Sequence, residues 1–400
     1  MRAQRTDGGF PPARSSQSPG VVAIFGSFLR LGITAFGGPA MISHIKEMSV
    51  KRNKWLTEET FKDGVVICQS VPGATAMQMA AYVGLRVKGV RGAVASYVGF
   101  GLPAFLLMLA LAVLYSGSRQ IPLVDSLFQG LQVMVVAIVA NATFTFGRDI
   151  GKIPLNLVLA VVAAAVFWIG VSPFVVIVGA AIAGGLMIRE PALPPPSAEK
   201  EGDAGKVHRP IVVFMVLVCV GVVGLYFADR KLYQLAALML RIDLFAFGGG
   251  FASLPLMFHE VVNSMAWLDG KTFMDGIALG QVTPGPIIIT ATFVGYLVRG
   301  FPGALVATAA IFTPSFVVLV TVTPFFDRLK NARYFSGATR GILASFVGLL
   351  LYLTFRFAVV VPWDAVKVLF GIAVIVALAR KVSILYVVLI GSALSIVVFR

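Results

Sequence analysis

Two arginines, and the glycines that follow them, have the clearest potential for chemistry in this sequence. Arg30 and Arg241 each lie in an apolar stretch, and each precedes a Phe-Gly-Gly triplet at the same spacing (residues 36–38 and 247–249). A cation inside an apolar segment faces protein or water and is a functional candidate by default. Guanidinium groups bind oxyanions through planar, multidentate hydrogen bonds. We expect Arg30 and Arg241 to meet near the membrane midplane and hold an oxyanion. The alternative is that each snorkels to a surface or forms a structural ion pair.

The glycines themselves predict a break in two helices. Gly37, Gly38 and Pro39 in the first half of the chain match a run of three glycines, residues 248–250, in the second. Glycine runs free the backbone from helical pairing, and a helix that restarts after a break points N–H groups and a positive dipole end at its surroundings. That arrangement suits an anion. The alternative is close helix packing through small residues.

A Pro-Gly pair in the middle of an apolar segment is the third element. Pro72-Gly73 and Pro284-Gly285 should end or kink a helix and leave backbone groups without partners. A simple kink, with nearby hydroxyls bonded back to the helix, is the alternative. Side-chain donors surround both pairs: Gln69, Ser70, Thr75, Gln78, Gln281, Thr283 and Thr290. The residues expected to contact a substrate are Arg30, Gly37, Gly38, Gln69, Pro72, Gly73, Thr75, Arg241, Gly248, Gly249, Gln281, Thr283, Pro284 and Gly285.

Asp243 is an acid within an apolar segment that has no counterpart in the other half. Gly32 occupies the matching place. Asp243 lies two residues from Arg241, so on a helix the two side chains point to different faces. We interpret Asp243 either as a structural counter-ion or as a carrier of protons, and the sequence does not choose between these.

The remaining polar residues predict neither an enzyme nor a metal site. Asp63 and Asp275 head two apolar segments, where acids favour a helix start, and we expect them to be caps or gate residues. His44 and His259 do not align in the repeat and have no metal-ligand company, so we expect them at an interface. No Walker A, Gly-x-Ser-x-Gly or His-Glu-x-x-His motif is present. No cofactor or metal is expected.

All of these residues belong to a repeat that runs through the chain. Phe-Gly-Gly, Trp, Asp-Gly, Gln, Pro-Gly and an aromatic-Val-Gly motif recur in the same order about 210 residues apart. Apolar residues make up 58% of the chain and charged residues 13%, whereas roughly a quarter of a soluble domain is charged. Two related halves with Gly and Pro breaks at matched places are typical of secondary transporters.

Apolar runs long enough to cross a bilayer predict thirteen transmembrane helices. They should be helices because an isolated strand cannot satisfy its backbone in lipid. We therefore predict an all-α, polytopic helical bundle with two homologous, inverted halves and broken helices at the midplane; re-entrant segments would reduce the number of crossings to as few as ten. The predicted segments are 20–43, 64–84, 92–116, 122–146, 153–169, 172–188, 211–228, 232–258, 274–297, 302–325, 337–360, 363–379 and 382–399.

Loop charges set the predicted orientation. The loop at residues 86–91 carries three positive side chains, whereas its counterpart carries one, Arg299. The next loop reverses this order, with Arg119 alone in the first half and three positive residues within 328–333 in the second. Equivalent loops that exchange positive charge lie on opposite faces, so the halves should be inverted in an inner membrane, with a cytoplasmic N-terminus.

The same distribution of charge bears on partners and domains. The formal net charge of +15 comes mostly from short connections between apolar runs, so nucleic acid is not an expected partner. The lipid bilayer is one, and a homodimer is an option. The expected units are a disordered basic cytoplasmic tail (1–19), an N-terminal membrane repeat (20–189), a Pro- and charge-rich cytoplasmic linker (190–210), a connecting transmembrane helix (211–229) and a C-terminal membrane repeat (230–400).

At these motifs the sequence resembles the chromate ion transporter family. Its long members have two homologous halves, each with a Phe-Gly-Gly-Pro-like motif and a later Pro-Gly motif. Here these are residues 36–39 with 71–73, and 247–250 with 283–286. Gly250 stands where the first half has Pro39, so the two breaks need not do the same job. The resemblance implies export of chromate from the cytoplasm across the inner membrane and resistance to chromate, with sulfate as the related tetrahedral dianion.

Three classes of function follow. The leading hypothesis is a secondary oxyanion exporter; the alternative is a channel-like or lipid-handling membrane protein, and a membrane enzyme is disfavoured by the missing motifs. Outward movement of a dianion across an inside-negative membrane is favourable by about 2.3 kcal/mol per charge per 100 mV. We therefore expect export driven by the membrane potential, with proton exchange through Asp243 as the alternative.

Overall fold

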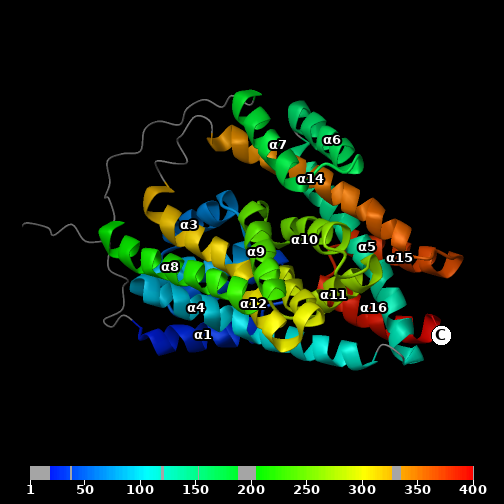
Figure 1. Cartoon of the computed structure of the whole chain (residues 1–400), viewed down its shortest axis with the longest axis horizontal. Helices are drawn as coiled ribbons and strands as arrows, with labels where there is room; N and C mark the ends of the chain where they lie inside the picture. The colour runs from blue at the N-terminus through cyan, green and yellow to red at the C-terminus, as the bar shows by residue number, and fades with distance from the viewer. Residues whose placement is uncertain are drawn as a thin grey trace, which may run out of the picture.

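A computed structural model of the chain describes residues 19–36, 38–118, 121–151, 153–187, 204–326 and 335–399. Throughout these ranges the protein is a bundle of helices, with no strand in the described part (Figure 1). Gly37, most of the predicted tail and linker residues 190–203 lie outside the described residues. Five described helical stretches are long and apolar enough to cross a membrane, which confirms the predicted all-helical membrane fold: Thr75–Ser118, Pro122–Ile150, Pro210–Ala228, Ile287–Phe325 and Phe335–Val360.

Each described element of the first half has a counterpart in the second. The first pairs are α1 (Val21–Thr34) with α9 (Arg230–Phe245), α2 (Gly38–Lys46) with α10 (Gly250–Phe258), the π-helical turn η1 (Glu47–Arg52) with η2 (His259–Ser264), and α3 (Glu58–Ser70) with α11 (Gly270–Val282). The later pairs are α4 (Thr75–Ser118) with η3 (Ile287–Ile289) and α12 (Thr290–Val322), α5 (Pro122–Ile150) with α14 (Phe335–Val360), α6 (Pro154–Trp168) with α15 (Ala365–Ala379), and α7 (Pro173–Met187) with α16 (Ile384–Val398). The 3₁₀ turn η4 (Thr323–Phe325) follows α12, and α8 (Ala204–Ala228) connects the halves.

The predicted break after each arginine is present. In the first half the helix ends at Thr34 and a new one begins at Gly38. In the second half the helix ends at Phe245, and the next begins at Gly250 after two glycines with positive φ. The segments predicted over 20–43 and 232–258 are therefore broken helices, as the glycine runs indicated.

The Pro-Gly pairs do more than kink a helix. α3 and residues 75–87 of α4 lie side by side and antiparallel. The contact between them is close, since a Cβ on Gly64 would lie 2.3 Å from the Tyr82 ring. The Tyr82 hydroxyl also donates to the carbonyl of Thr60 at 3.1 Å. A helix of 13 residues is about 20 Å long, too short to cross a hydrocarbon core of about 30 Å. The single crossing helix predicted over 64–84 is therefore wrong, and the chain forms a re-entrant hairpin.

The second half repeats this hairpin. A Cβ on Gly276 would lie 2.4 Å from the Phe293 ring, so α11 lies antiparallel to the start of α12. The single helix predicted over 274–297 is wrong for the same reason. We call α3 with residues 75–87 the first hairpin and α11 with residues 287–298 the second hairpin. Residues 71–74 are the first tip, and residues 283–286 are the second tip.

Each hairpin leads through a tight turn into a long helix. Lys88 and Gly89 interrupt α4 with non-helical angles, and Arg299 and Gly300 do the same in α12. A Cβ on Gly84 would lie 2.2 Å from the Gly92 carbonyl oxygen, although eight residues of straight helix span about 12 Å. Residues 90–118 therefore run back along residues 75–87. Glycine is needed here because the two helix backbones touch.

The halves exchange elements instead of packing as separate units. The α6–α7 pair of the first half packs against α14 of the second, and α15 and α16 of the second half pack against α5 of the first (Figure 1). Small residues line these contacts: a Cβ on Gly341 would lie 2.0 Å from the Ala180 carbonyl oxygen, and one on Gly348 would lie 2.3 Å from that of Ala160. The repeats consequently share one core.

The two hairpins differ in their surroundings even though their sequences match. α11 packs against α5, α14 and α16 as well as its own α12, whereas within the described residues α3 has extensive contacts only with α4. The buried Asp275 carboxylate accepts from the Tyr115 hydroxyl at 2.7 Å and from the Gln132 amide at 2.6 Å. Its counterpart Asp63 is exposed. The symmetric chain thus adopts an asymmetric arrangement.

Candidate functional site

The two tips meet the two helix breaks across the halves. The amide N–H of Gly73, in the first tip, donates to the carbonyl of Ala246 in the second-half break at 2.9 Å. Reciprocally, the N–H of Gly285 in the second tip donates to the carbonyl of Ala35 at 3.1 Å. Each half therefore supplies the backbone partner that the other half's tip lacks, as in a two-fold interface.

Only glycine fits at the two tip positions. Gly73 has φ of +117° and Gly285 has φ of +106°, conformations that side chains with a Cβ rarely adopt. A Cβ on Gly73 would also lie 2.1 Å from the Cβ of Ser315, and one on Gly285 would lie 2.9 Å from that of Ala104. Ala104 and Ser315 are themselves equivalent in the repeat. Close backbone approach is thus built into both tips.

Three helix starts converge beside these tips. A Cβ on Gly249, the residue before α10, would lie 3.3 Å from the hydroxyl of Thr75, which begins α4. A Cβ on Gly250 would lie 3.8 Å from the backbone nitrogens of Ile287 and Ile288, where the run leading into α12 begins. First-turn N–H groups have no partner within their own helix, and the dipole places positive charge at that end. The junction can therefore stabilise an anion without any charged side chain.

Polar side chains near the junction are partly engaged with the tips. The Gln78 amide donates to the Pro72 carbonyl at 2.5 Å, whereas its own carbonyl oxygen is buried without a hydrogen-bond partner. Thr283 and Thr290 donate to backbone carbonyls of their own turns. The Gln281 amide nitrogen is buried without a partner, and Gln69 is exposed on the last turn of α3.

The structure therefore gathers a subset of the predicted site residues. Those at the tips and breaks are Pro72, Gly73, Thr75, Gly248, Gly249, Thr283, Pro284 and Gly285. Gly38 begins α2 at the first break. Gln78 is also at the tip, and its position one turn into a helix that starts at Thr75 explains why it reaches back to Pro72.

Arg241 has a partner that the sequence did not indicate. Its guanidinium lies 2.5 Å from the Glu260 carboxylate and stacks over the Phe174 ring at 4.5 Å. Glu260 is buried, whereas the Arg241 side chain is 48% exposed. Glu260 lies in the π-helical turn η2, and Met48 takes its place in η1. Arg241 therefore has a glutamate partner, whereas the equivalent position in the first half is a methionine.

Arg30 is exposed and forms no ion pair with any described residue. A meeting of Arg30 with Arg241 remains a prediction. The two arginines differ in their charge environment, because within the described residues Arg241 pairs with a carboxylate and Arg30 does not.

Asp243, on α9, is buried and bonds to α12, the long helix of the same half. Its carboxylate accepts from the backbone N–H of Ser315 at 2.7 Å, and its other oxygen has no partner. The Ser315 hydroxyl lies 3.0 Å from the hydroxyl of Tyr97, which donates to the Phe312 carbonyl. In the first half a Cβ on Gly32 would lie 2.5 Å from the Phe100 carbonyl oxygen. Asp243 thus lies at a position where, in the first half, Gly32 packs directly against the backbone of Phe100.

Asp63 and Asp275 are not helix caps. Thr57 caps α3 and Asp269 caps α11, each accepting from a backbone N–H three residues later. Asp63 and Asp275 lie one and a half turns farther along, so their role as gate residues stays a prediction. Among the described residues, no group of three or more His, Cys, Asp and Glu could hold a metal ion.

Comparison with known proteins gives a consistent result. The profile of a family described as "Chromate transporter" matches residues 22–185 and again residues 233–396, so it covers both halves. An uncharacterized transporter of Methanocaldococcus jannaschii is 42% identical over 378 residues, which is 94% of this chain and 93% of that protein. A chromate transport protein of Cupriavidus metallidurans is 31% identical over 84% of this chain and 83% of its own length. A chromate transport protein of Pseudomonas aeruginosa is 30% identical over 82% and 78%. No solved structure matches the chain.

The tip geometry predicts that Gly73→Ala is severely damaging. The added methyl group overlaps Ser315 and forces an unfavourable φ, which should cost roughly 3 kcal/mol or more. Gly89→Ala is the matched control, because Gly89 has φ of +62° but open space around its Cβ position, so it should cost about 1–2 kcal/mol. Thermal unfolding of the purified proteins in detergent tests this, and equal melting temperatures for the two variants would contradict the tip contact.

Proposed function

Because this chain belongs to the chromate transporter family, we propose that it carries chromate, or a related tetrahedral oxyanion such as sulfate, out of the cytoplasm across the inner membrane. Proteins of this family transport ions and are not enzymes. The observation that supports an oxyanion most directly is the convergence of three helix starts on the two tips. Export of chromate by this route would give the cell resistance to it.

Beside the tips, backbone N–H groups at the helix starts would replace part of the water around the dianion. Helix N-termini in a site sheltered from water bind anions through these groups and through the helix dipole. A tetrahedral oxyanion presents oxygens in several directions, so it can accept at once from the helix starts that follow the two tips. The substrate contacts we propose are the first break and tip (Gly37, Gly38, Gln69, Pro72, Gly73 and Thr75) and the second (Gly248, Gly249, Gln281, Thr283, Pro284 and Gly285).

Arg30 and Arg241 would draw the oxyanion toward this junction. Among the described residues no carboxylate pairs with Arg30, whereas Glu260 offsets the charge of Arg241. The two arginines should therefore contribute unequally.

In cells, we expect expression of the protein to lower the accumulation of labelled chromate relative to an empty-vector control. Arg30→Ala should abolish most of this difference, and Arg241→Ala should reduce it less. Arg230→Ala is the matched control, since Arg230 stacks over Tyr226 at the start of α9, away from the breaks. Chromate accumulation that is the same with and without the wild-type protein would remove chromate as the substrate.

We propose that the membrane potential drives export. A dianion that leaves an inside-negative cell gains about 4.6 kcal/mol per 100 mV, from about 2.3 kcal/mol per charge. The alternative is proton exchange through Asp243, which is buried and has one carboxylate oxygen without a partner.

Reconstituted vesicles separate these two energy sources. With an imposed potential and no pH gradient, labelled chromate should move toward the positive side, and Asp243→Asn should keep this movement. Movement under a pH gradient alone, lost in Asp243→Asn, would instead establish proton exchange.

The different surroundings of the two hairpins support alternating access. We propose that the second hairpin is docked in this state while the first is released, and that the opposite state exchanges these roles. Lys271 on α11 contacts Asp125 on α5 at 3.2 Å. The repeat places Glu59 and Ser336 at the mirrored positions, so these two residues should approach each other when the first hairpin docks.

Cross-linking tests this exchange in a background lacking Cys68 and Cys219. A short thiol cross-linker should join Lys271→Cys to Asp125→Cys and stop transport. It should also prevent a second pair, Glu59→Cys with Ser336→Cys, from being joined in the same molecule. Continued transport after complete cross-linking of the first pair, or full cross-linking of both pairs together, would refute alternating docking.

The inverted arrangement of the halves, with a cytoplasmic N-terminus, is also a proposal. Loop charges support it. Accessibility of tags at the two termini in intact cells should report opposite sides. Two cytoplasmic termini would rule out this topology.

A lipid-handling protein is the alternative function, and one feature favours it. An apolar cavity of about 550 Å³ lies between α4, α8 and α12. The hydroxyls that line it, those of Tyr97, Thr308 and Thr313, all donate within the protein, so the cavity offers mainly apolar contacts. Vesicles that scramble labelled lipid but do not move chromate would favour this alternative.

A further inference from the structure

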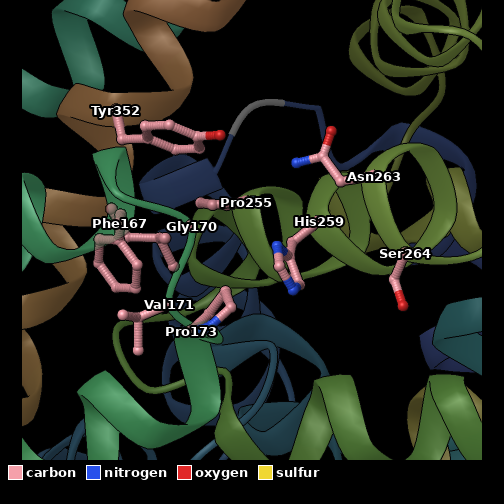
Figure 2. Close-up of a pocket in the computed structure, with 10 residues that line it drawn as sticks. Phe167, Gly170, Val171, Pro173, Pro255, His259, Asn263, Ser264 and Tyr352 are labelled. Atoms are coloured by element: carbon pink, nitrogen blue, oxygen red, sulfur yellow. The ribbon is translucent and has the colours of Figure 1, made fainter.

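A second cavity, of about 340 Å³, lies where both halves meet outside the tips. The loop between α6 and α7 forms one wall, the end of α10 with η2 forms another, and α14 forms the third (Figure 2). We call it the His259 cavity. Asn263 on its rim is exposed, so the cavity opens to the surface of the protein.

The polar groups of the His259 cavity have unused hydrogen-bonding capacity. Figure 2 shows the Tyr352 hydroxyl and the Asn263 amide pointing toward each other across the cavity, with the His259 imidazole beside them. Within the described part of the chain, none of these three side chains has a hydrogen-bond or ion-pair partner. Convergent polar groups on an otherwise apolar wall are the usual features of a small-molecule site.

An arginine–glutamate ion pair borders this cavity. Arg241 stacks over Phe174, which follows the lining residue Pro173, and it pairs with Glu260, which follows His259. A guanidinium has five N–H donors, and one carboxylate can occupy only some of them. The remaining donors, with the tyrosine hydroxyl and the asparagine amide, make a set of groups that donates more than it accepts.

The mirrored place in the other half lacks these properties. Glu47 and Lys51 stand where η2 has His259 and Asn263, and they pair with each other at 2.9 Å. Their polar capacity is used internally. The fold therefore does not by itself create unpaired polar groups at this position, because the equivalent position in the first half has a paired Glu47 and Lys51.

We infer that the His259 cavity is a vestibule that binds the transported oxyanion before it reaches the tips or after it leaves them. The inference depends on the proposed function for the identity of the ligand. A tetrahedral oxyanion matches a site rich in donors beside an arginine. Arg241 would then serve the vestibule, where its pairing with Glu260 allows the anion to be released.

Sulfate binding to the purified protein in lipid nanodiscs tests this. The Trp168 ring lies 6.1 Å from the Tyr352 ring, so its fluorescence should report an occupied cavity once Trp55, Trp267 and Trp363 are replaced by Phe. We expect the half-saturating sulfate concentration to rise about tenfold in Tyr352→Phe combined with Asn263→Ala. Lys51→Ala, at the mirrored place, should leave it unchanged.

Transport distinguishes failure of this inference from failure of the proposed function. The double variant should raise the KM for chromate and retain the maximal rate, with an unchanged melting temperature. If wild-type protein transports chromate but sulfate affinity and KM are the same in the double variant, the cavity holds only water and the inference is overturned. If sulfate binds as expected but no oxyanion is transported, the cavity is confirmed as a site and the proposed function fails.

Discussion

A reciprocal pair of backbone hydrogen bonds, Gly73 to Ala246 and Gly285 to Ala35, is the constraint on which the rest of the structure depends. A helix that stops inside a membrane leaves N–H and carbonyl groups without water, and each one costs several kcal/mol if it stays unpaired. The amides of Gly73 and Gly285 have their partners in the opposite half, so each tip depends on a carbonyl in the break of the other half. This requirement explains why both breaks and both Pro-Gly tips recur in the sequence, and why the two halves stay packed against each other.

On this symmetric frame, three carboxylates of the second half have surroundings that the first half does not repeat. Asp243 faces Ser315 where Gly32 packs on backbone, Glu260 pairs with Arg241 where Met48 stands in the first half, and Asp275 is buried between Tyr115 and Gln132 where Asp63 is exposed. In each case the second half has a buried or paired carboxylate whose counterpart in the first half is either not an acid or is exposed. The two halves of the protein are therefore chemically unequal.

Much of this arrangement could be predicted from the sequence, because Gly and Pro mark positions where backbone geometry is restricted. The repeat, the helix breaks and the glycine tips follow from that rule, and the bounds predicted for α5, α6, α7, α15 and α16 agree closely with the structure. The hairpins could not be predicted in this way. Hydropathy is continuous across residues 64–84, and a chain that reverses at Pro72-Gly73 stays as apolar as one that continues. The partner of Arg241 could not be predicted, because Glu260 follows the apolar segment predicted over 232–258 and looks like part of a loop. Its contact with Arg241 depends on tertiary packing.

Protection of a single cysteine tests most directly whether an oxyanion occupies the junction of the tips. Thr75→Cys, in a protein without Cys68 and Cys219, places a thiol beside Gly249 at the start of a helix. The rate at which a small thiol reagent modifies this cysteine should fall severalfold when sulfate is added, and chloride at equal ionic strength should not change it. Identical rates with sulfate and with chloride would show that the tips do not bind the anion and would contradict the account.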